Sequence, residues 1–444
     1  MTEATAGQER WAGQAGFLLA AVGAAVGLGN IWRFAYIVGD NGGGAFILAY
    51  LAALLVVGLP LLMAELLVGR EARDDAASAF RRLRPGAGAA ATGWLGVTAS
   101  VVILSYYAVI TGWVARYMAG YLAGGDILAG AAPQAEFARF VAGPVEPILW
   151  QAAVLVGTAG IVSLGVARGI EAASRLLMPV FALIVVALAI YGLSLPGAGV
   201  ALAFLFTPDW TAMAEPRTWI VAIGQAFFSI GLGMGVLVTY GSYLPRSVSI
   251  VRAAGSIIVG DTLIALVAGI MIFSPLFTFG LNPAHGPALA FVVLPEVFSG
   301  IAFGGVLGAA FFLLLLLAAL TSAVALMEVP VAVLMTRFGR SRREASMLAA
   351  IGVFVLGLPS ALGYGPLGDA LRLPAPVLDL VDHLASEVLL PISGMAIALF
   401  VGWRWQAAGT HLTSAPGRFA WLWVLRLLVP SAIAVLMLAG LLGG

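Results

Sequence analysis

Long apolar segments alternate with short polar ones along the whole chain. Eleven apolar segments approach or exceed about 20 residues, the length that an α-helix needs to cross the hydrocarbon core of a bilayer. They occupy residues 12–38, 45–69, 91–123, 147–165, 172–192, 217–243, 251–280, 303–336, 345–363, 375–401 and 417–441. The pattern therefore predicts an all-α polytopic membrane protein, with residues 1–443 forming one transmembrane domain.

The composition agrees with this prediction and narrows the chemistry. The 444 residues are 62% hydrophobic and 10% charged, which is more apolar surface than a water-soluble domain can bury. The net charge of +1 argues against a nucleic-acid partner. With no cysteine, three histidines and no carboxylate pair, the chain offers little for an enzyme to use, so we expect none.

The placement of arginine predicts the orientation. Arginines cluster in two short loops, after the second and the eighth apolar segments: Arg70, Arg73, Arg81, Arg82 and Arg84, then Arg337, Arg340, Arg342 and Arg343. The segments on the opposite side, such as 124–146 and 193–216, are richer in acidic residues. By the positive-inside rule, the N-terminus is cytoplasmic and the C-terminus extracytoplasmic.

Two glycine-rich stretches interrupt the first and the sixth segments. They read "VGLGN" at 26–30 and "IGLGMG" at 230–235. Glycine disfavours a helix by about 1 kcal/mol relative to alanine, so each stretch is a weak point. One such stretch is typical of close helix packing. Two matching stretches five helices apart indicate inverted repeats whose broken helices form a binding site at the membrane midplane.

These stretches and their surroundings resemble the neurotransmitter:sodium symporter family. "AAVGLGNIWRF" and "NGGGAFILAY" are similar to its first-helix signature, and "LSYYAVITGW", "GQAFFSIGLGMG" and "ALTSAVAL" to its third, sixth and eighth helices. The resemblance implies an inverted five-plus-five helix repeat, the leucine-transporter-like fold. Its repeats would span about 11–192 and 217–401, with one extra helix at 417–441. Eleven helices are typical of the bacterial amino-acid branch, which lies in the inner membrane.

The resemblance also implies two sodium ions, bound by the oxygen ligands that hard cations prefer. The second site maps to Gly23, Val26, Ala318, Thr321 and Ser322. The first maps to Ala25, Asn30, Ser229 and Asp261, completed by the substrate carboxylate. Two simpler interpretations stay open. The Thr-Ser pair can hydrogen-bond the carbonyl one turn earlier, and Asp261 can be a helix-end residue at the cytoplasmic boundary.

Chloride independence is a further expectation. The chloride site of animal relatives would be framed here by Tyr50, Gln225, Ser229 and a serine position that holds Ala265. A fixed carboxylate at Asp261 would supply the negative charge that chloride provides elsewhere.

The resemblance places an α-amino acid between the broken helices. Monoamine carriers have an aspartate where this chain has Ala24, and this difference favours an α-amino acid over a biogenic amine as the substrate. The substrate-binding positions of the family map to Ala25, Leu28, Gly29, Ile103, Tyr107, Phe228, Ser229, Gly231, Met234, Ser322 and Leu326. Gly231 and Met234 leave room for a large side chain, so hydrophobic or aromatic L-amino acids are expected. Such an apolar lining can also be ordinary core.

Gates are expected on both sides of this site. The outer one maps to Arg33 and Asp382, with Gln225 beside them and Phe228 as a lid. Read alone, Arg33 could be a snorkelling interface residue.

The cytoplasmic gate of the family matches only in part. Trp11 and Tyr243 agree, whereas the usual arginine and acidic partner fall on Gln8 and Thr336, so closure through Arg10 is one possibility. Glu65 matches a glutamate of the family that supports the unwound sixth helix through its backbone amides.

Together these features predict sodium-coupled symport of an amino acid by alternating access, in a monomer or homodimer within the lipid bilayer. The alternatives are a substrate-gated channel and a non-transporting amino-acid sensor on the same scaffold. A channel needs a continuous polar path, but the polar residues here cluster at one depth. A sensor is expected to carry a soluble output domain, and the sequence indicates none.

Overall fold

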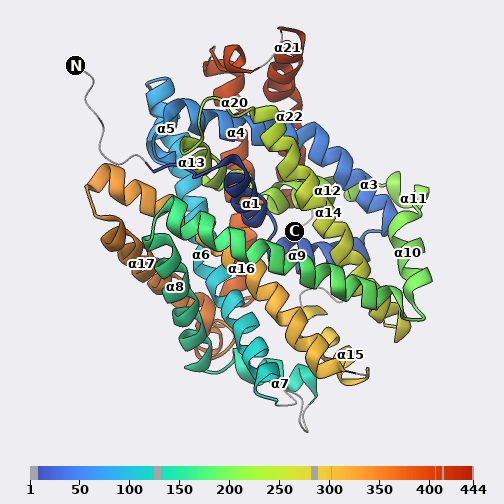
Figure 1. The fold of residues 1–444 in the computed structure, drawn as a ribbon. Coiled ribbons are helices and arrows are strands. Elements are labelled where there is room, and N and C mark those ends of the chain that lie inside the picture. Colours follow the sequence, from blue (N-terminus) through green and yellow to red (C-terminus); the bar gives the residue numbers. More distant parts are fainter. Residues whose placement is uncertain are drawn as a thin grey trace.

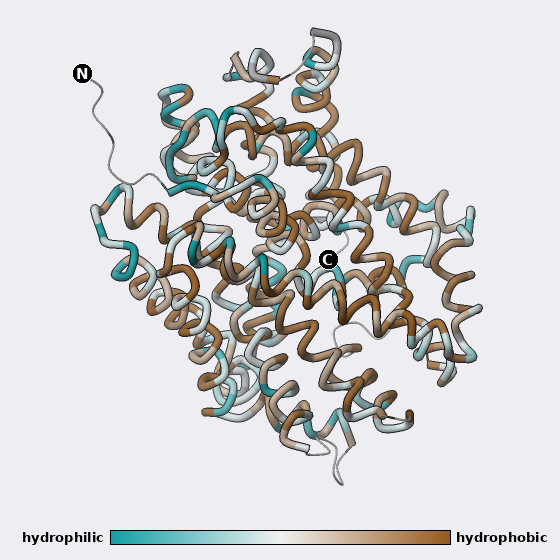
Figure 2. Tube along the Cα trace, viewed as in Figure 1, coloured by the Kyte–Doolittle hydropathy of each residue, from teal (hydrophilic) through white to brown (hydrophobic). Residues whose placement is uncertain are grey.

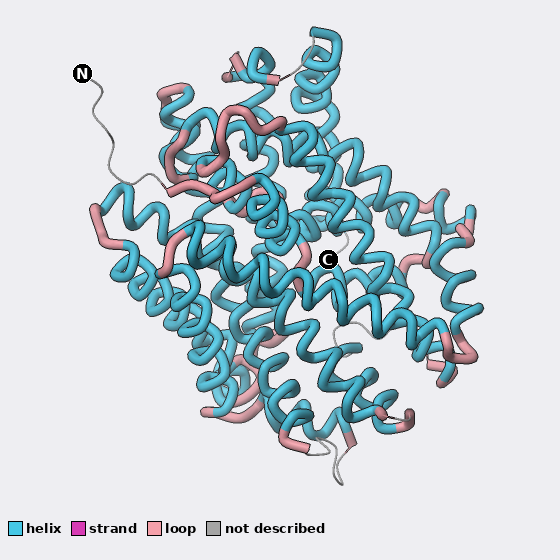
Figure 3. The backbone as a smooth tube through the Cα atoms, in the orientation of Figure 1, coloured by secondary structure: helices cyan, strands magenta, loops and turns pink. Residues whose placement is uncertain are grey.

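The computed structural model describes residues 9–124, 132–281, 289–301, 303–405, 407–412 and 415–442. In these ranges the chain forms helices joined by short loops, without a strand (Figures 1 and 3). Short helices connect the long ones: α5 (Ala76–Leu83), α7 (Pro133–Val141), α10 (Ala198–Phe206), α11 (Trp210–Met213), α15 (Leu294–Ser299) and α18 (Pro366–Leu371). The all-α prediction is confirmed.

Nine continuous helical spans in the described part of the chain are long and apolar enough to cross a membrane. They are Gly44–Ala72 (α3, η2, α4), Ala87–Leu122 (α6), Glu146–Ser163 (α8), Val166–Leu193 (η3, α9), Ile250–Thr278 (α14), Gly304–Phe338 (α16), Arg342–Leu362 (α17), Val377–Arg404 (α19, η5, α20, η6) and Gly417–Gly440 (within α21, η8, α22). These nine coincide with nine of the predicted segments. The other two, 12–38 and 217–243, are the segments with glycine-rich interruptions.

The first interrupted segment is a bent helix. It consists of α1 (Gln14–Ala25), then η1 (Gly29–Arg33) and α2 (Phe34–Asp40), and the two parts are inclined by 53°. The chain leaves the helical region at Val26, whose ψ is 90°. The break predicted at 26–30 is therefore present.

The sixth segment is broken by its glycines. Helix α12 (Pro216–Ile230) and helix α13 (Val236–Ser242) are separated by Gly231–Gly235. In this linker Gly231, Gly233 and Gly235 have φ values of 73°, 79° and 70°, in the left-handed region that residues with a Cβ adopt at a cost. The same three glycines that signalled the break in the sequence thus make it sterically possible.

Helices α6 and α16 form the centre of the bundle (Figure 1). In each, 78% of the most apolar window is buried, against 17% in the C-terminal span. Large apolar side chains such as Val156 of α8 and Leu183 of α9 lie 70% or more exposed on the outer helices. Figure 2 shows hydrophobic residues along the outside of the bundle, as expected for helices that face lipid.

Candidate ion and substrate site

A buried polar cluster lies beside the break in the first helix. Helix α14 places Asp261 eleven residues after its start at Ile250, with the side chain fully buried. The Asp261 carboxylate accepts hydrogen bonds from Asn30 Nδ2 (2.6 Å), Ser229 Oγ (2.9 Å) and the Tyr50 hydroxyl (3.0 Å). The alternative of a helix-end aspartate does not describe this position, because Asp261 lies inside α14 and away from solvent.

All three of these donors are neutral. Within the described chain, the Asp261 carboxylate forms no ion pair with an arginine or histidine. A buried charge without a counterion is costly, and removing one partner of a buried pair costs about 3–5 kcal/mol. The cluster therefore has the electrostatic character of a cation site. Three of its four residues, Asn30, Ser229 and Asp261, belong to the predicted first sodium site, and the fourth, Tyr50, belongs to the mapped chloride frame. Ala25, the remaining residue of the predicted site, is the last residue of α1.

A second group of oxygens lies where α1 meets α16. Ser322 Oγ donates to the carbonyls of Ala24 (3.2 Å) and Gly23 (3.5 Å). Thr321 Oγ1 donates within its own helix to the Ala318 carbonyl at 2.9 Å. This is the hydrogen bond to a carbonyl one turn earlier that the simpler interpretation predicts for a Thr-Ser pair. A Cβ added to Gly23 would lie 3.3 Å from the Thr321 Cβ, so the two helices touch here.

A small central cavity joins most of the predicted substrate-binding residues. It has a volume of about 40 Å³ and lies between the two helix breaks and helices α6 and α16. The predicted residues that line it are Ala25, Gly29, Ile103, Tyr107, Phe228, Gly231, Met234, Ser322 and Leu326. The volume suits a few water molecules, so side chains must move before an aromatic amino acid can enter. Leu28 is near it, and its N–H donates to the Tyr107 hydroxyl at 3.3 Å.

Glu65 of α4 supports the broken sixth helix. Its Oε1 accepts a hydrogen bond of 2.8 Å from the Gly233 N–H, and the side chain is fully buried. This contact satisfies an amide that the helix break leaves without an intrahelical partner. The family resemblance predicts a supporting role of this kind for Glu65.

A larger cavity of about 290 Å³, here called the aromatic cavity, lies next to the central one at the Arg33 end of the first helix. Phe228 and Tyr107 line both cavities and separate them. The Arg33 guanidinium lies 4.2 Å from the Phe228 ring centre and 4.0 Å from the Asp382 carboxylate. Asp382 is held more tightly by the Tyr106 hydroxyl, at 2.7 Å. Gln225 is not part of this wall; its Nε2 donates to the Gly29 carbonyl.

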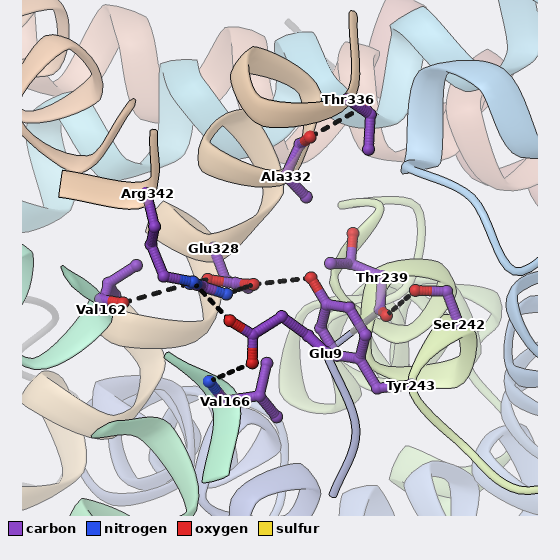
Figure 4. A network of polar contacts seen from close by, with 10 residues as sticks. All are labelled: Glu9, Val162, Val166, Thr239, Ser242, Tyr243, Glu328, Ala332, Thr336 and Arg342. Atoms are coloured by element: carbon purple, nitrogen blue, oxygen red, sulfur yellow. Dashed lines mark hydrogen bonds and ion pairs between the residues drawn. The ribbon is translucent and has the colours of Figure 1, made fainter. Parts of the chain in front are cut away.

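The opposite end of the first helix, at Trp11, is closed by a charged network (Figure 4). Arg342 donates two hydrogen bonds to the fully buried Glu328, at 2.8 and 2.7 Å, and one to Glu9 at 3.0 Å. Tyr243 donates to the same Glu328 at 2.6 Å, and Glu9 also accepts from the Val166 N–H. The network ties the N-terminal segment to η3, to α16, to α17 and to Tyr243, the residue that follows α13.

The other residues predicted at this end have separate contacts. Trp11 Nε1 donates to the Tyr240 carbonyl at 3.1 Å. Arg10 is exposed, and the described residues give it no ion pair. Thr336 donates to Asp75 at 2.7 Å, where burial raises the pKa of the Asp75 carboxyl. Gln8 lies outside the described residues.

Sequence reasoning missed several of these groups. Tyr50 was considered only as part of a chloride frame, and its direct bond to Asp261 was not foreseen. The sequence pattern does not single out Glu9 or Glu328, and it assigns Arg342 only to the positive-inside pattern. An available signal was Glu328 itself, because an acidic residue inside a membrane helix needs a partner.

Comparisons with known proteins agree with this geometry. The model of the sodium:neurotransmitter symporter family matches residues 8–124 and 143–439. YhdH of Bacillus subtilis (strain 168), described as an uncharacterized sodium-dependent transporter, is 36% identical over 440 residues, covering 97% of each chain. A sodium-dependent serotonin transporter of Drosophila melanogaster is 30% identical over 419 residues, covering 82% of this chain and 65% of that protein.

A solved structure is also similar over nearly the whole chain. The crystal structure of MhsT in complex with L-phenylalanine superposes with a TM-score of 0.89 at 45% identity, covering 98% of this chain and 100% of MhsT. The broken helices and the buried polar cluster between them therefore lie in a known transporter fold. This chain is a multi-pass member of the sodium:neurotransmitter symporter family.

Proposed function

We propose that this protein takes up hydrophobic or aromatic L-amino acids together with two sodium ions. The observation that carries the proposal is the buried Asp261 carboxylate, which has only neutral hydrogen-bond donors and lies beside unwound backbone. A sodium ion there would supply the missing positive charge. Turning the Asn30 amide by 180° would direct its oxygen, instead of its nitrogen, toward this ion.

The second ion would bind between α1 and α16. Its ligands would be the Gly23, Val26 and Ala318 carbonyls with the Thr321 and Ser322 hydroxyls. In support, Ser322 already reaches across to α1, and Gly23 contacts Thr321. Two charges crossing 100 mV contribute roughly 4.6 kcal/mol, enough for about three decades of amino-acid accumulation.

Transport would proceed by alternating access, with the first, second, sixth and seventh helices of the two inverted repeats, about 11–192 and 217–401, rocking against the rest. The Arg33–Asp382 pair would form the extracytoplasmic gate, and the Arg342 network the cytoplasmic one. The N-terminus would then be cytoplasmic and the C-terminus extracytoplasmic, in a bacterial inner membrane. In this proposal Arg342, and not Arg10, closes the cytoplasmic gate.

A thermal-shift screen tests the proposal. The twenty amino acids are added to purified protein in sodium or potassium buffer, and the melting temperature is recorded. Large apolar amino acids should raise it in sodium and leave it unchanged in potassium. Equal stabilisation in both buffers would contradict sodium coupling.

Substrate preference should follow the apolar area that the lining of the central cavity can bury once its side chains have moved apart. L-Phenylalanine is the ligand named for MhsT, and burial of a large side chain gains roughly 25 cal/mol per Å². We therefore expect Trp, Phe, Tyr and Leu to bind better than Ala or Gly, and charged amino acids to be rejected. Competition against a labelled amino acid measures this order. If wild type prefers glycine or alanine to every aromatic amino acid, the size prediction is wrong and the family assignment stands.

Met234→Phe should shift this preference from Trp toward Leu or Ala, by about tenfold in the ratio of inhibition constants. Gly231 is a poor place for the same test, because its φ of 73° would strain any side chain. Met347→Phe is the matched control, since Met347 is 58% exposed on α17. An unchanged Trp to Leu ratio in Met234→Phe would exclude Met234 from the substrate pocket.

A further inference from the structure

Two carboxylates join the starts of two helices at the end of the bundle opposite the aromatic cavity. Glu171 is the last residue of η3 (Val166–Glu171), which continues directly into α9, and its Oε2 accepts a hydrogen bond of 2.7 Å from the Ala12 N–H. Glu9 reaches in the opposite direction, and its Oε2 accepts a hydrogen bond of 3.1 Å from the Val166 N–H (Figure 4). Each helix start thus receives a carboxylate from the segment at the start of the other.

Neither helix start has a side-chain cap of its own. The N-cap residues of α1 and η3 are Gly13 and Gly165, which have no side chain that could accept a hydrogen bond. The N–H groups at a helix start lack intrahelical partners, and the helix dipole favours negative charge there. The carboxylates of Glu9 and Glu171, here called the paired caps, supply both the acceptor and the charge. Moving α1 away from α9 therefore breaks both caps.

The Glu171 side chain is fitted closely against α1. It is 1% exposed, and Arg175 of the same span donates to its Oε1 at 2.6 Å. A Cβ on Gly16 would overlap the Glu171 carboxylate, so glycine at this position leaves the space that the carboxylate occupies. In the described structure the hydrogen bonds of Arg342 reach Glu9 but not Glu171. The cap at Glu171 is therefore a contact separate from the Arg342 network.

The two capped helices belong to parts that move relative to each other under the proposed function, on which this inference rests. Alternating access moves α1, which belongs to the first helix, against α9, which belongs to the fifth. Farther along the same interface, Gly23 of α1 lies against the Met178 side chain, a contact through dispersion that has no preferred direction. The hydrogen bond from Ala12 to Glu171 is directional, so it has to break before the start of α1 can leave α9.

We propose that Glu171 is a positioning residue that keeps the cytoplasmic half of α1 closed against α9, in addition to the Arg342 network. Removing its carboxylate shifts the protein toward the conformation that is open to the cytoplasm. The signature is faster access of water-soluble reagents to buried residues of α1 while sodium is present. A purely structural residue would lower the melting temperature and leave this access in the folded protein unchanged.

Thiol labelling tests this proposal, because the chain has no cysteine of its own. Ala21→Cys places a single thiol at a fully buried position of α1, where a water-soluble maleimide reaches it only after α1 has moved. In sodium buffer its labelling should be slow. Adding Glu171→Ala should raise the labelling rate by about fivefold or more. Glu171→Gln should raise it less, because its amide oxygen can still accept the hydrogen bond from the Ala12 N–H.

Gly16→Ala displaces the Glu171 carboxylate without removing it. In the Ala21→Cys background it should therefore label as fast as Glu171→Ala. The double variant should label no faster than either single variant, because both changes remove the same contact. Glu215→Ala and Gly160→Ala are the matched controls, since Glu215 is exposed and a Cβ on Gly160 would meet no neighbouring helix within 4 Å.

The melting temperature of each variant shows that it is folded at the labelling temperature, and Glu171→Gln replaces Glu171→Ala if the alanine variant does not fold. Equal labelling of Ala21→Cys with and without the Glu171 substitution would overturn the proposal. Faster labelling of the double variant than of either single variant would also overturn it. Failure of the proposed function looks different: Ala21→Cys alone would label equally fast in sodium and potassium. The comparison with the Glu171 variant in either buffer then still decides whether Glu171 holds α1.

Discussion

Replacing Asp261 with asparagine is expected to reduce sodium-driven amino-acid uptake by about 100-fold or more. Asparagine has nearly the same shape and can still accept hydrogen bonds from Ser229 and Tyr50, so the substitution mainly removes the charge. Two unit charges 4 Å apart attract by about 4 kcal/mol at an effective dielectric constant of 20, which is nearly three decades of affinity. Initial uptake rates as a function of sodium concentration measure the loss.

The companion experiment to Asp261→Asn replaces chloride with another anion in the uptake assay of the wild-type protein. If Asp261 supplies the fixed negative charge, replacing chloride with gluconate should leave uptake unchanged. Wild-type protein that stops transporting without chloride would show that the charge argument is wrong. Unimpaired sodium affinity in Asp261→Asn would remove Asp261 from the ion site.

Arg342→Gln is expected to have the second large effect, at the opposite end of the bundle. The substitution leaves Glu328 buried without a guanidinium, and breaking a buried ion pair costs about 3–5 kcal/mol. It also frees Glu9, so the N-terminal segment loses a contact to the bundle. The melting temperature of the purified protein should fall, and uptake should fall with it.

The double variant Arg342→Gln with Glu328→Gln separates charge from packing. Because it removes the uncompensated carboxylate, it should recover part of the melting temperature that the single variant loses. Arg343→Gln is the matched control, since Arg343 is the next residue in the chain and is exposed. A single variant as stable as wild type would contradict a structural role for the network.

The helical framework could be predicted because its signals are local. Segment length and hydropathy mark each span, and the glycines of 26–30 and 230–235 mark both breaks. The convergence of Asn30, Ser229 and Asp261 could be predicted only through the family resemblance. No sequence pattern alone brings residues 231 positions apart into a 2.6 Å contact.

The Arg342 network could not be predicted for the same physical reason. Arg342 and Glu9 are separated by 333 residues, and each is an ordinary charged residue near a helix end. Arg342 fitted the positive-inside pattern, which needs no partner for it. The volume of the central cavity could not be predicted from the sequence either, because it depends on how Phe228, Met234 and their neighbours pack.

The most direct test of sodium-coupled symport is amino-acid accumulation by the purified protein in proteoliposomes. Labelled L-phenylalanine or L-leucine is supplied outside, with an inward gradient of either sodium or potassium. We predict accumulation above the external concentration with sodium, and its collapse when an ionophore dissipates the sodium gradient. Equal uptake with both cations, or uptake that only equilibrates the amino acid in a sodium gradient, would contradict the account.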